Sequence, residues 1–162
     1  MKDFDKIYQE HYLALYRIAL KMLRDKDIAS DVLQDVFIAF FEVVRNGKEI
    51  LNTKSYLLRA TLNKCIDCSA RGLRHEKIQR NYDQPSEKYE EGEDDREVIR
   101  IALNAMNGED RKLLVLYSEG YSYKEIAEIS GMKFSSVGKT LSRALKKMKE
   151  VINKLDYEMS QR

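Results

Sequence analysis

Several residue types and sequence features are scarce in this chain of 162 residues. It has two cysteines, one proline and no tryptophan, which excludes the disulfide framework that holds many small secreted domains together. No stretch approaches the roughly eighteen consecutive apolar residues of a membrane span, and no signal peptide opens the sequence. We therefore expect a cytoplasmic protein with no direct membrane insertion.

The sequence also lacks the patterns that carry most enzyme chemistry. It has no glycine-rich phosphate loop, no catalytic serine or cysteine motif and no cluster of metal ligands, and its two histidines, His11 and His75, stand far apart. These absences predict a protein that is not an enzyme and that holds no cofactor.

The two cysteines, Cys65 and Cys68, form a C-x-x-C pair. Such a pair occurs in redox sites and in half of a zinc site. No second cysteine pair or histidine pair completes a zinc site, and the strands that surround a redox pair are missing. Because the two cysteines are three residues apart, their side chains would share one face of a helix. We therefore expect them to be small packing residues that bind no metal.

Charge is distributed unevenly along the chain. Residues 1–75 hold 13 Lys and Arg against 10 Asp and Glu, residues 76–97 hold 4 against 9, and residues 98–162 hold 12 against 8. The acidic segment also contains Pro85, the only proline, and has too few apolar residues to form a core. This pattern predicts two small domains, 1–75 and 98–162, joined by an acidic flexible linker at 76–97.

Apolar residues recur at helical spacing in the first domain, and nothing shows the sustained alternation of a strand. A second helix is expected to start at Asp25 or Asp27 and to end at Asn46-Gly47, before a polar loop at 46–54. The spacing of a first helix is marked by Phe4, Ile7, Tyr8, Leu15, Ile18, Ala19 and Met22. The expected buried residues are Ile28, Val32, Val36, Ala39, Phe40 and Val43 in the second helix, and Leu58, Leu62, Cys65 and Ile66 in a third helix from about 55 to 71. The prediction is an all-α bundle.

The second domain contains the spacing of a helix-turn-helix. Gly131 follows Ala127 by four residues, where a tight turn needs tolerance of positive φ, and Val137 and Leu141 follow at positions that pin a second helix onto the first. That second helix is expected to bury Val137, Leu141, Leu145 and Met148 and to expose Ser135, Ser136, Lys139, Thr140 and Arg143.

From Lys133 to Lys149 there are six basic residues and no acidic one. A solvated surface helix would also carry charge, but the turn, the core spacing and the single sign of the charge together favour DNA binding. Gly138 departs from this pattern, because glycine inside a helix costs about 1 kcal/mol relative to alanine.

Three strings, in order, resemble the extracytoplasmic-function (ECF) group of the sigma-70 family. ASDVLQDVFIAFFE at 29–42 is similar to that family's polymerase-binding helix, with its A-x-D-x-x-Q-[DE]-x-F pattern. YLLRATLNKCIDCSAR at 56–71 resembles the following helix, although Tyr56 replaces the usual Trp and Leu58 the usual Tyr. The run from Glu119 to Met148 is similar to the promoter-reading domain.

The resemblance implies a transcription initiation factor with core RNA polymerase, promoter DNA and an anti-sigma factor as partners. The first domain would bind the beta-prime clamp helices and the melted minus-10 element, and the last would bind the minus-35 duplex and the beta flap. The residues expected at these contacts are Asp31, Gln34 and Asp35 for polymerase, Tyr56, Arg59, Asn63 and Lys64 for minus-10 DNA, and Ser135, Ser136, Lys139, Thr140, Arg143, Lys146 and Lys147 for minus-35 DNA.

The minus-10 assignment and the acidic linker each have a physical argument of their own. A polar loop beside tyrosine, amide and basic groups suits single-stranded DNA, although Tyr56 fits a core position equally well. Clustered carboxylates from about Asp83 to Glu97 imitate a phosphate backbone, so we expect the linker to occupy a basic channel of polymerase rather than to serve only as a tether.

The main alternative is a helix-turn-helix regulator that binds duplex DNA without joining polymerase. In the response-regulator type, the N-terminal half is a doubly wound α/β receiver with β-branched strands and an acidic pocket. Residues 1–75 contain no such strands, so this alternative is disfavoured.

Overall fold

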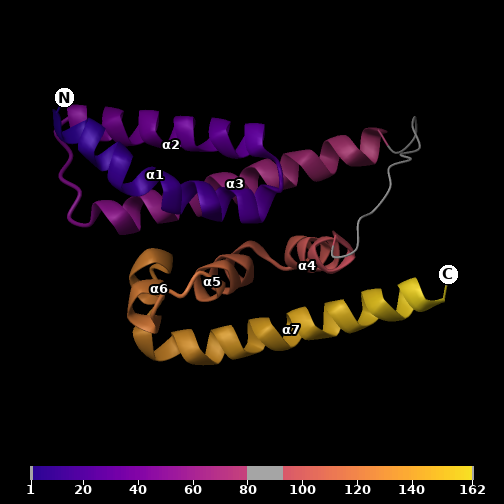
Figure 1. Cartoon of the computed structure of the whole chain (residues 1–162). Coiled ribbons are helices and arrows are strands. Elements are labelled where there is room, and N and C mark those ends of the chain that lie inside the picture. The colour runs from indigo at the N-terminus through magenta and orange to yellow at the C-terminus, as the bar shows by residue number, and fades with distance from the viewer. Residues whose placement is uncertain (1, 80–92, 162) are drawn as a thin grey trace.

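All the regular elements of the computed structural model are α-helices within residues 2–79 and 93–161, the parts of the chain that the structure describes. The first three, α1 (Lys2–Leu23), α2 (Lys26–Arg45) and α3 (Thr53–Gln79), run up, down and up beside one another (Figure 1). The others are α4 (Glu93–Ala105), α5 (Gly108–Ser118), α6 (Tyr123–Ser130) and α7 (Phe134–Ser160). The predicted all-α class is confirmed.

The ends of α2 follow from local chemistry. Of the two candidate caps it is Asp25 that begins the helix, where its Oδ1 accepts hydrogen bonds from the backbone N–H groups of Asp27 and Ile28, both at 2.9 Å. The helix ends at Asn46, and Gly47 follows with a φ of +79°, a conformation that glycine adopts without strain.

The predicted inward stripe of α2 was partly wrong. Ile28 is 45% exposed and Ala39 also faces solvent. The buried residues of this helix are Ala29, Val32, Leu33, Val36, Phe37 and Phe40. Because α2 packs against both α1 and α3, its buried face is broader than a single stripe and is rotated from the predicted one.

Two helices extend into the segment predicted as a linker. Helix α3 continues to Gln79, beyond the predicted end at Arg71, and α4 begins at Glu93. Residues 80–92, which hold Pro85 and four of the nine acidic residues of the 76–97 segment, lie outside the described residues. The proposed role of this segment in polymerase therefore stays a prediction.

The two helical units pack against each other. Helix α1 contacts α5 and α3 contacts α6, while the long α7 forms the outer edge of the second unit (Figure 1). A single hydrophobic cluster includes Leu15 and Ile18 from the first unit and Leu113 and Leu116 from the second. No helix in the described residues combines the length and apolar character that a membrane crossing requires.

Candidate nucleic-acid and polymerase interfaces

The predicted helix-turn-helix is formed by α6 and α7. Ser122 and Glu125 form a reciprocal capping box that begins α6, and Gly131 ends it with a φ of +73°. Ile126 of α6 and Val137 of α7 are both completely buried. The glycine turn and the apolar spacing therefore have the roles that the sequence indicated.

Helix α7 presents most of its predicted DNA-facing residues to solvent. Exposed or half-exposed are Ser135, Ser136, Lys139, Thr140, Arg143 and Lys146. Lys147 is also exposed, but its Nζ lies 2.9 Å from Oδ2 of the buried Asp110 and so holds α7 to α5. Leu145, expected in the core, is 42% exposed, and Ala144 is buried in its place.

The structure supplies a reason for the glycine inside α7. A Cβ at Gly138 would lie 3.3 Å from Cε2 of Tyr123, closer than an ordinary van der Waals contact. The absence of a side chain therefore lets the two helices of the motif approach closely at this point. This spatial reason offsets the cost in helix propensity.

The predicted polymerase-binding residues lie together on one face of α2. Asp31, Gln34 and Asp35 are all exposed. Gln34 also lines a hollow of about 320 Å³ whose other walls include Tyr8 of α1 and Ile38 of α2. An exposed apolar surface thus adjoins the polar one.

Sequence reasoning missed these apolar residues. Ile38 is 51% exposed, and Tyr8 and Phe41 are exposed beside it. The available signal was the run FIAFFE, in which apolar side chains continue all round the helix although only one face can be buried. Large exposed side chains of this kind mark contact surfaces.

The four residues predicted to bind minus-10 DNA have different surroundings. Tyr56 is half-buried with its ring 5.8 Å from that of Phe40, so it packs at the edge of the core. Asn63 is exposed. Lys64 is half-buried, and its Nζ lies 3.0 Å from Oδ2 of Asp35, which joins a predicted DNA contact to a predicted polymerase contact.

Arg59, the fourth of these residues, binds the other unit. Its Nε donates to the carbonyl oxygen of Ile129 and its Nη2 to that of Glu128, both at 2.7 Å. These carbonyls belong to the last turn of α6, where a helix carries partial negative charge and unpaired acceptors. A basic residue of the first unit thus caps a helix of the helix-turn-helix.

Polar contacts beside Arg59 extend the same interface. The side-chain amide of Asn52 donates to Glu128, and Lys54 Nζ lies 3.3 Å from Glu125 and 5.2 Å from the ring centre of Tyr121. Asn52 also begins α3, because its Oδ1 accepts from the N–H of Ser55. The end of the 46–54 loop therefore lies against α6.

One loop residue stands apart from this interface. Leu51 is 94% exposed. When a ligand covers an exposed apolar side chain, the removal of its surface from water favours binding. The polar description of the loop overlooked this residue.

Cys65 is completely buried in the core, and Cys68 is half-buried. Burial raises the pKa of the Cys65 thiol to about 12, with a smaller effect from Cys68 in the same direction. Its thiolate is therefore scarce at neutral pH, which opposes redox or metal chemistry. Among the described residues, no three potential ligands lie together to hold a metal ion.

The fold and these surfaces define a helical DNA-binding protein with a helix-turn-helix unit and a second unit suited to protein contacts. Family models for sigma-70 region 2 and sigma-70 region 4 match residues 7–75 and 96–148 respectively. The chain belongs to the ECF group of the sigma-70 family of transcription initiation factors.

Curated relatives cover nearly all of the chain. The ECF RNA polymerase sigma factor SigE of Mycolicibacterium smegmatis is 27% identical over 99% of this chain and 66% of its own length. The RNA polymerase sigma factor YlaC of Bacillus subtilis is 24% identical over 94% of this chain and 93% of its own length.

Two solved structures have a similar fold. The sigma factor RpoE of Bartonella quintana, in complex with the anti-sigma factor NepR, is 22% identical with a TM-score of 0.62 and covers 94% of this chain and 98% of its own. CnrH, in complex with the cytosolic domain of CnrY, is 18% identical with a TM-score of 0.63 and covers 94% of this chain and 88% of its own.

Proposed function

We propose that this sigma factor binds core RNA polymerase through the exposed face of α2 and recognises promoter DNA with two separate surfaces. The first surface is the basic face of α7, for the minus-35 duplex. The second is the 46–54 loop with the adjoining face of α3, for the melted minus-10 strand. The observation that carries this proposal is the built helix-turn-helix whose second helix exposes basic residues and no acidic ones from Lys133 to Lys149.

The face of α2 supports polymerase binding over the alternative of a regulator that acts on duplex DNA alone. Asp31, Gln34 and Asp35 lie beside exposed apolar side chains such as Ile38. A polar rim around an apolar centre is the usual anatomy of a protein interface. A regulator that does not join polymerase has no need of this surface.

The loop and α3 have the chemistry to hold an unstacked base. Unstacking costs a few kcal/mol, which a pocket must return through contacts. The exposed Leu51 offers an apolar contact, and the amide of Asn63 offers both a donor and an acceptor. Tyr56 supports this face from the edge of the core.

The packed arrangement of the two units must open for both promoter elements to be bound. Elements about 25 base pairs apart are separated by about 85 Å along the DNA at a rise of 3.4 Å per pair. In the structure, by contrast, Lys54 at the end of the loop contacts Glu125 in the helix-turn-helix. Recognition of both elements by one molecule therefore requires loss of the Arg59 and Lys54 contacts.

An anti-sigma factor is a further proposed partner. RpoE, a sigma factor of similar fold, has been solved with the anti-sigma factor NepR. In this proposal the chain recognises promoter DNA and positions polymerase on it, and it carries out no chemical step of its own.

Run-off transcription with core polymerase tests the proposal. The wild-type chain should direct initiation from specific start sites, and exchanging residues 46–54 for the loop of another ECF factor should change the preferred minus-10 sequence. Leu51→Ser should reduce strand opening without reducing thermal stability. The control is Leu13→Ser, which changes an exposed leucine on α1 and should leave strand opening unchanged. Absence of specific initiation together with absence of core binding would refute the proposed function.

A further inference from the structure

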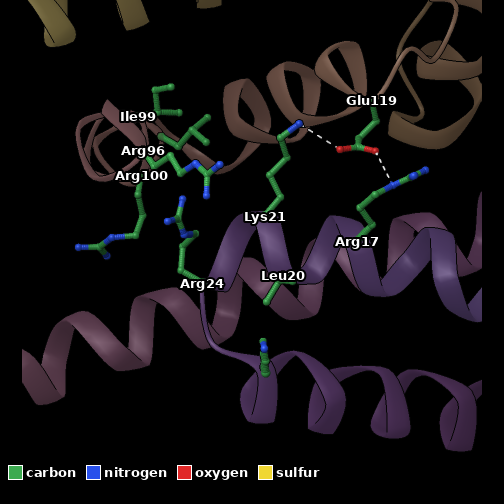
Figure 2. Close-up of a pocket in the computed structure, with 10 residues that line it drawn as sticks. Arg17, Leu20, Lys21, Arg24, Arg96, Ile99, Arg100 and Glu119 are labelled. Carbon is green, nitrogen blue, oxygen red and sulfur yellow. Dashed lines mark hydrogen bonds and ion pairs between the residues drawn. The ribbon is translucent and has the colours of Figure 1, made fainter. Parts of the chain in front are cut away.

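A groove of about 630 Å³ lies between the first unit and the second (Figure 2). Its walls come from the C-terminal half of α1, from the α1–α2 turn and the first residue of α2, from α4 and from the residue that follows α5. They consist of Arg17, Leu20, Lys21, Arg24, Lys26, Arg96, Ile99, Arg100, Leu103 and Glu119. Six of these ten residues are cationic and one is anionic.

The single carboxylate of the groove is fully engaged. Glu119 has a side chain only 11% exposed, and it is held by Arg17 at 3.3 Å and Lys21 at 3.0 Å (Figure 2). Lys21 also donates to the hydroxyl of Ser118 at 2.8 Å. This network fixes one end of the groove and leaves it positively charged, because two cations share one negative group.

The other end of the groove has an excess of positive charge. Arg100 pairs with Glu97, and Arg24 helps to lower the pKa of the same carboxyl group. Within the part of the chain that the structure describes, Arg24, Lys26 and Arg96 form no ion pair. Like charges gathered in a hollow repel one another, so an anion is the natural counterpart.

Arg24 is held in this place at a conformational cost. Its φ of +57° is the only positive value at a non-glycine residue in the described chain, and its N–H donates to the carbonyl of Leu20 at 2.9 Å. The left-handed conformation costs a non-glycine residue about 1–2 kcal/mol. An arginine where glycine would be easier indicates that the side chain is needed, and Figure 2 shows it directed toward α4.

We propose that this groove binds a small ligand carrying a chain of two or more phosphates, such as a nucleoside di- or triphosphate. Guanidinium groups match phosphate oxygens in geometry and charge. Leu20, Ile99 and Leu103 provide an apolar wall for a base. The volume lies within the range of small-ligand sites, and the walls enclose the ligand from two units.

Binding at this groove favours the packed arrangement. The ligand contacts α1 in one unit and α4 in the other, so the groove exists only while the units are together. A ligand that binds one state alone shifts the equilibrium toward that state. At ten times its Kd, it reduces the ratio of open to packed molecules about tenfold.

Titration calorimetry on the full chain tests the site, with GTP, inorganic tripolyphosphate, GMP and a random-sequence DNA duplex as probes. GTP or tripolyphosphate should bind at least about tenfold more tightly than GMP. Equal affinity for GTP and tripolyphosphate would identify a site for phosphate chains alone, and tighter GTP binding would identify a nucleotide site. Binding of the duplex alone would overturn the proposal.

Matched variants locate the binding. Arg24→Glu with Arg96→Glu should weaken GTP and tripolyphosphate binding at least about tenfold, and the neutral pair Arg24→Ala with Arg96→Ala should weaken it less. Arg71→Glu with Lys154→Glu makes the same change of charge outside the groove and should leave binding unchanged. Circular dichroism confirms folding of each variant.

Equal weakening by the groove and control variants, or by none, would overturn the proposal. Fluorescence energy transfer between labels on α3 and α7 supplies a second readout, in which ligand should reduce the open population of the wild type and of the control variant but not of Arg24→Glu with Arg96→Glu. Run-off transcription on the same preparations separates the two ideas, because loss of initiation with intact ligand binding would refute only the promoter function.

Discussion

Arg59 in the first helical unit donates its Nε–H to the carbonyl oxygen of Ile129 at the end of α6, over 2.7 Å. The sequence resemblance assigns Arg59 to minus-10 DNA, yet in the structure it caps a helix of the helix-turn-helix. One side chain therefore serves either the contact between the units or the DNA. This competition makes the strength of the interface measurable by mutation.

We expect Arg59→Ala to open the two units. Two hydrogen bonds from a charged donor to carbonyl groups, partly exposed to solvent, contribute about 1 kcal/mol, so the open population should rise about fivefold. Small-angle scattering or energy transfer between labels on α3 and α7 measures the change. Arg71→Ala, on an exposed part of α3, is the control, and an equal response from both variants would show that the Arg59 contact does not hold the units together.

We expect Gln34→Ala to weaken binding to core polymerase without disturbing the minus-10 face, whereas Asp35→Ala should affect both. Gln34 borders the apolar hollow, whereas loss of Asp35 also removes the partner of Lys64 and disturbs the minus-10 face. Truncation of a residue that carries binding energy at a protein interface costs about 1 kcal/mol or more, which is about a fivefold loss of affinity. Affinity for core polymerase provides the measurement, with Asp67→Ala as the exposed control on α3. Unchanged affinity in Gln34→Ala and Asp35→Ala alike would place the polymerase contact elsewhere.

We expect Gly138→Ala to have opposing effects that a double-mutant cycle separates. Alanine favours the helix by about 1 kcal/mol, but its Cβ would lie 3.3 Å from the ring of Tyr123. In the wild-type background the gain should be small, and in a Tyr123→Ala background it should approach the full value. Urea denaturation measures both free energies of unfolding. An equal gain in the free energy of unfolding in the two backgrounds would mean that the Tyr123 ring is not the reason for glycine at position 138.

We expect Lys139→Ala and Lys147→Ala to differ although both residues lie on α7. Lys139 is exposed, so its loss should weaken binding to minus-35 DNA and, if it contacts phosphate, reduce the salt slope by about one. Lys147 pairs with the buried Asp110, so its loss should cost about 1 kcal/mol of stability. Binding over a salt series and thermal denaturation distinguish the two effects. Identical behaviour of the two variants would show that Lys147 does not stabilise the fold through Asp110.

We expect Cys65 to make the protein less stable at alkaline pH. Burial raises its thiol pKa from about 9 to about 12, so the folded state favours the neutral thiol. The resulting stabilisation is complete below pH 9 and is lost as the pH rises toward 12. The free energy of unfolding should therefore fall less steeply above pH 9 in Cys65→Ala than in the wild type. Cys68→Ala should keep the wild-type slope, and identical slopes in all three proteins would mean that Cys65 is not buried as described.

The elements of this protein follow from local sequence. The aspartate cap at 25 or 27, the Asn46-Gly47 ending and the Gly131 turn were predicted because each depends on backbone groups within a few residues. The helix-turn-helix was predicted for the same reason, since its apolar spacing lies within one short stretch. The family pattern at residues 29–42 also indicated the exposed polar residues of α2, because helical spacing alone decides which residues share a face.

Other features depended on contacts between residues distant in sequence. The rotated buried face of α2, the exposed Leu145 and the pairing of Lys147 with Asp110 arise where one helix meets another. Helical periodicity gives the existence of an apolar face but not its width, which depends on how many neighbours cover it. The reason for Gly138 was hidden in the same way, because Tyr123 lies in a different helix.

The sequence by itself determined an all-α chain with a helix-turn-helix and the family to which its motifs belong, since these depend on spacing along the chain. Only the tertiary structure decided that Arg59 binds α6, that Lys64 joins Asp35 and that α1 and α4 form a cationic groove. Each of these joins side chains that no local pattern relates. Their proximity is set by the packing of whole helices, in which the apolar surface buried outweighs the preference of any one polar side chain.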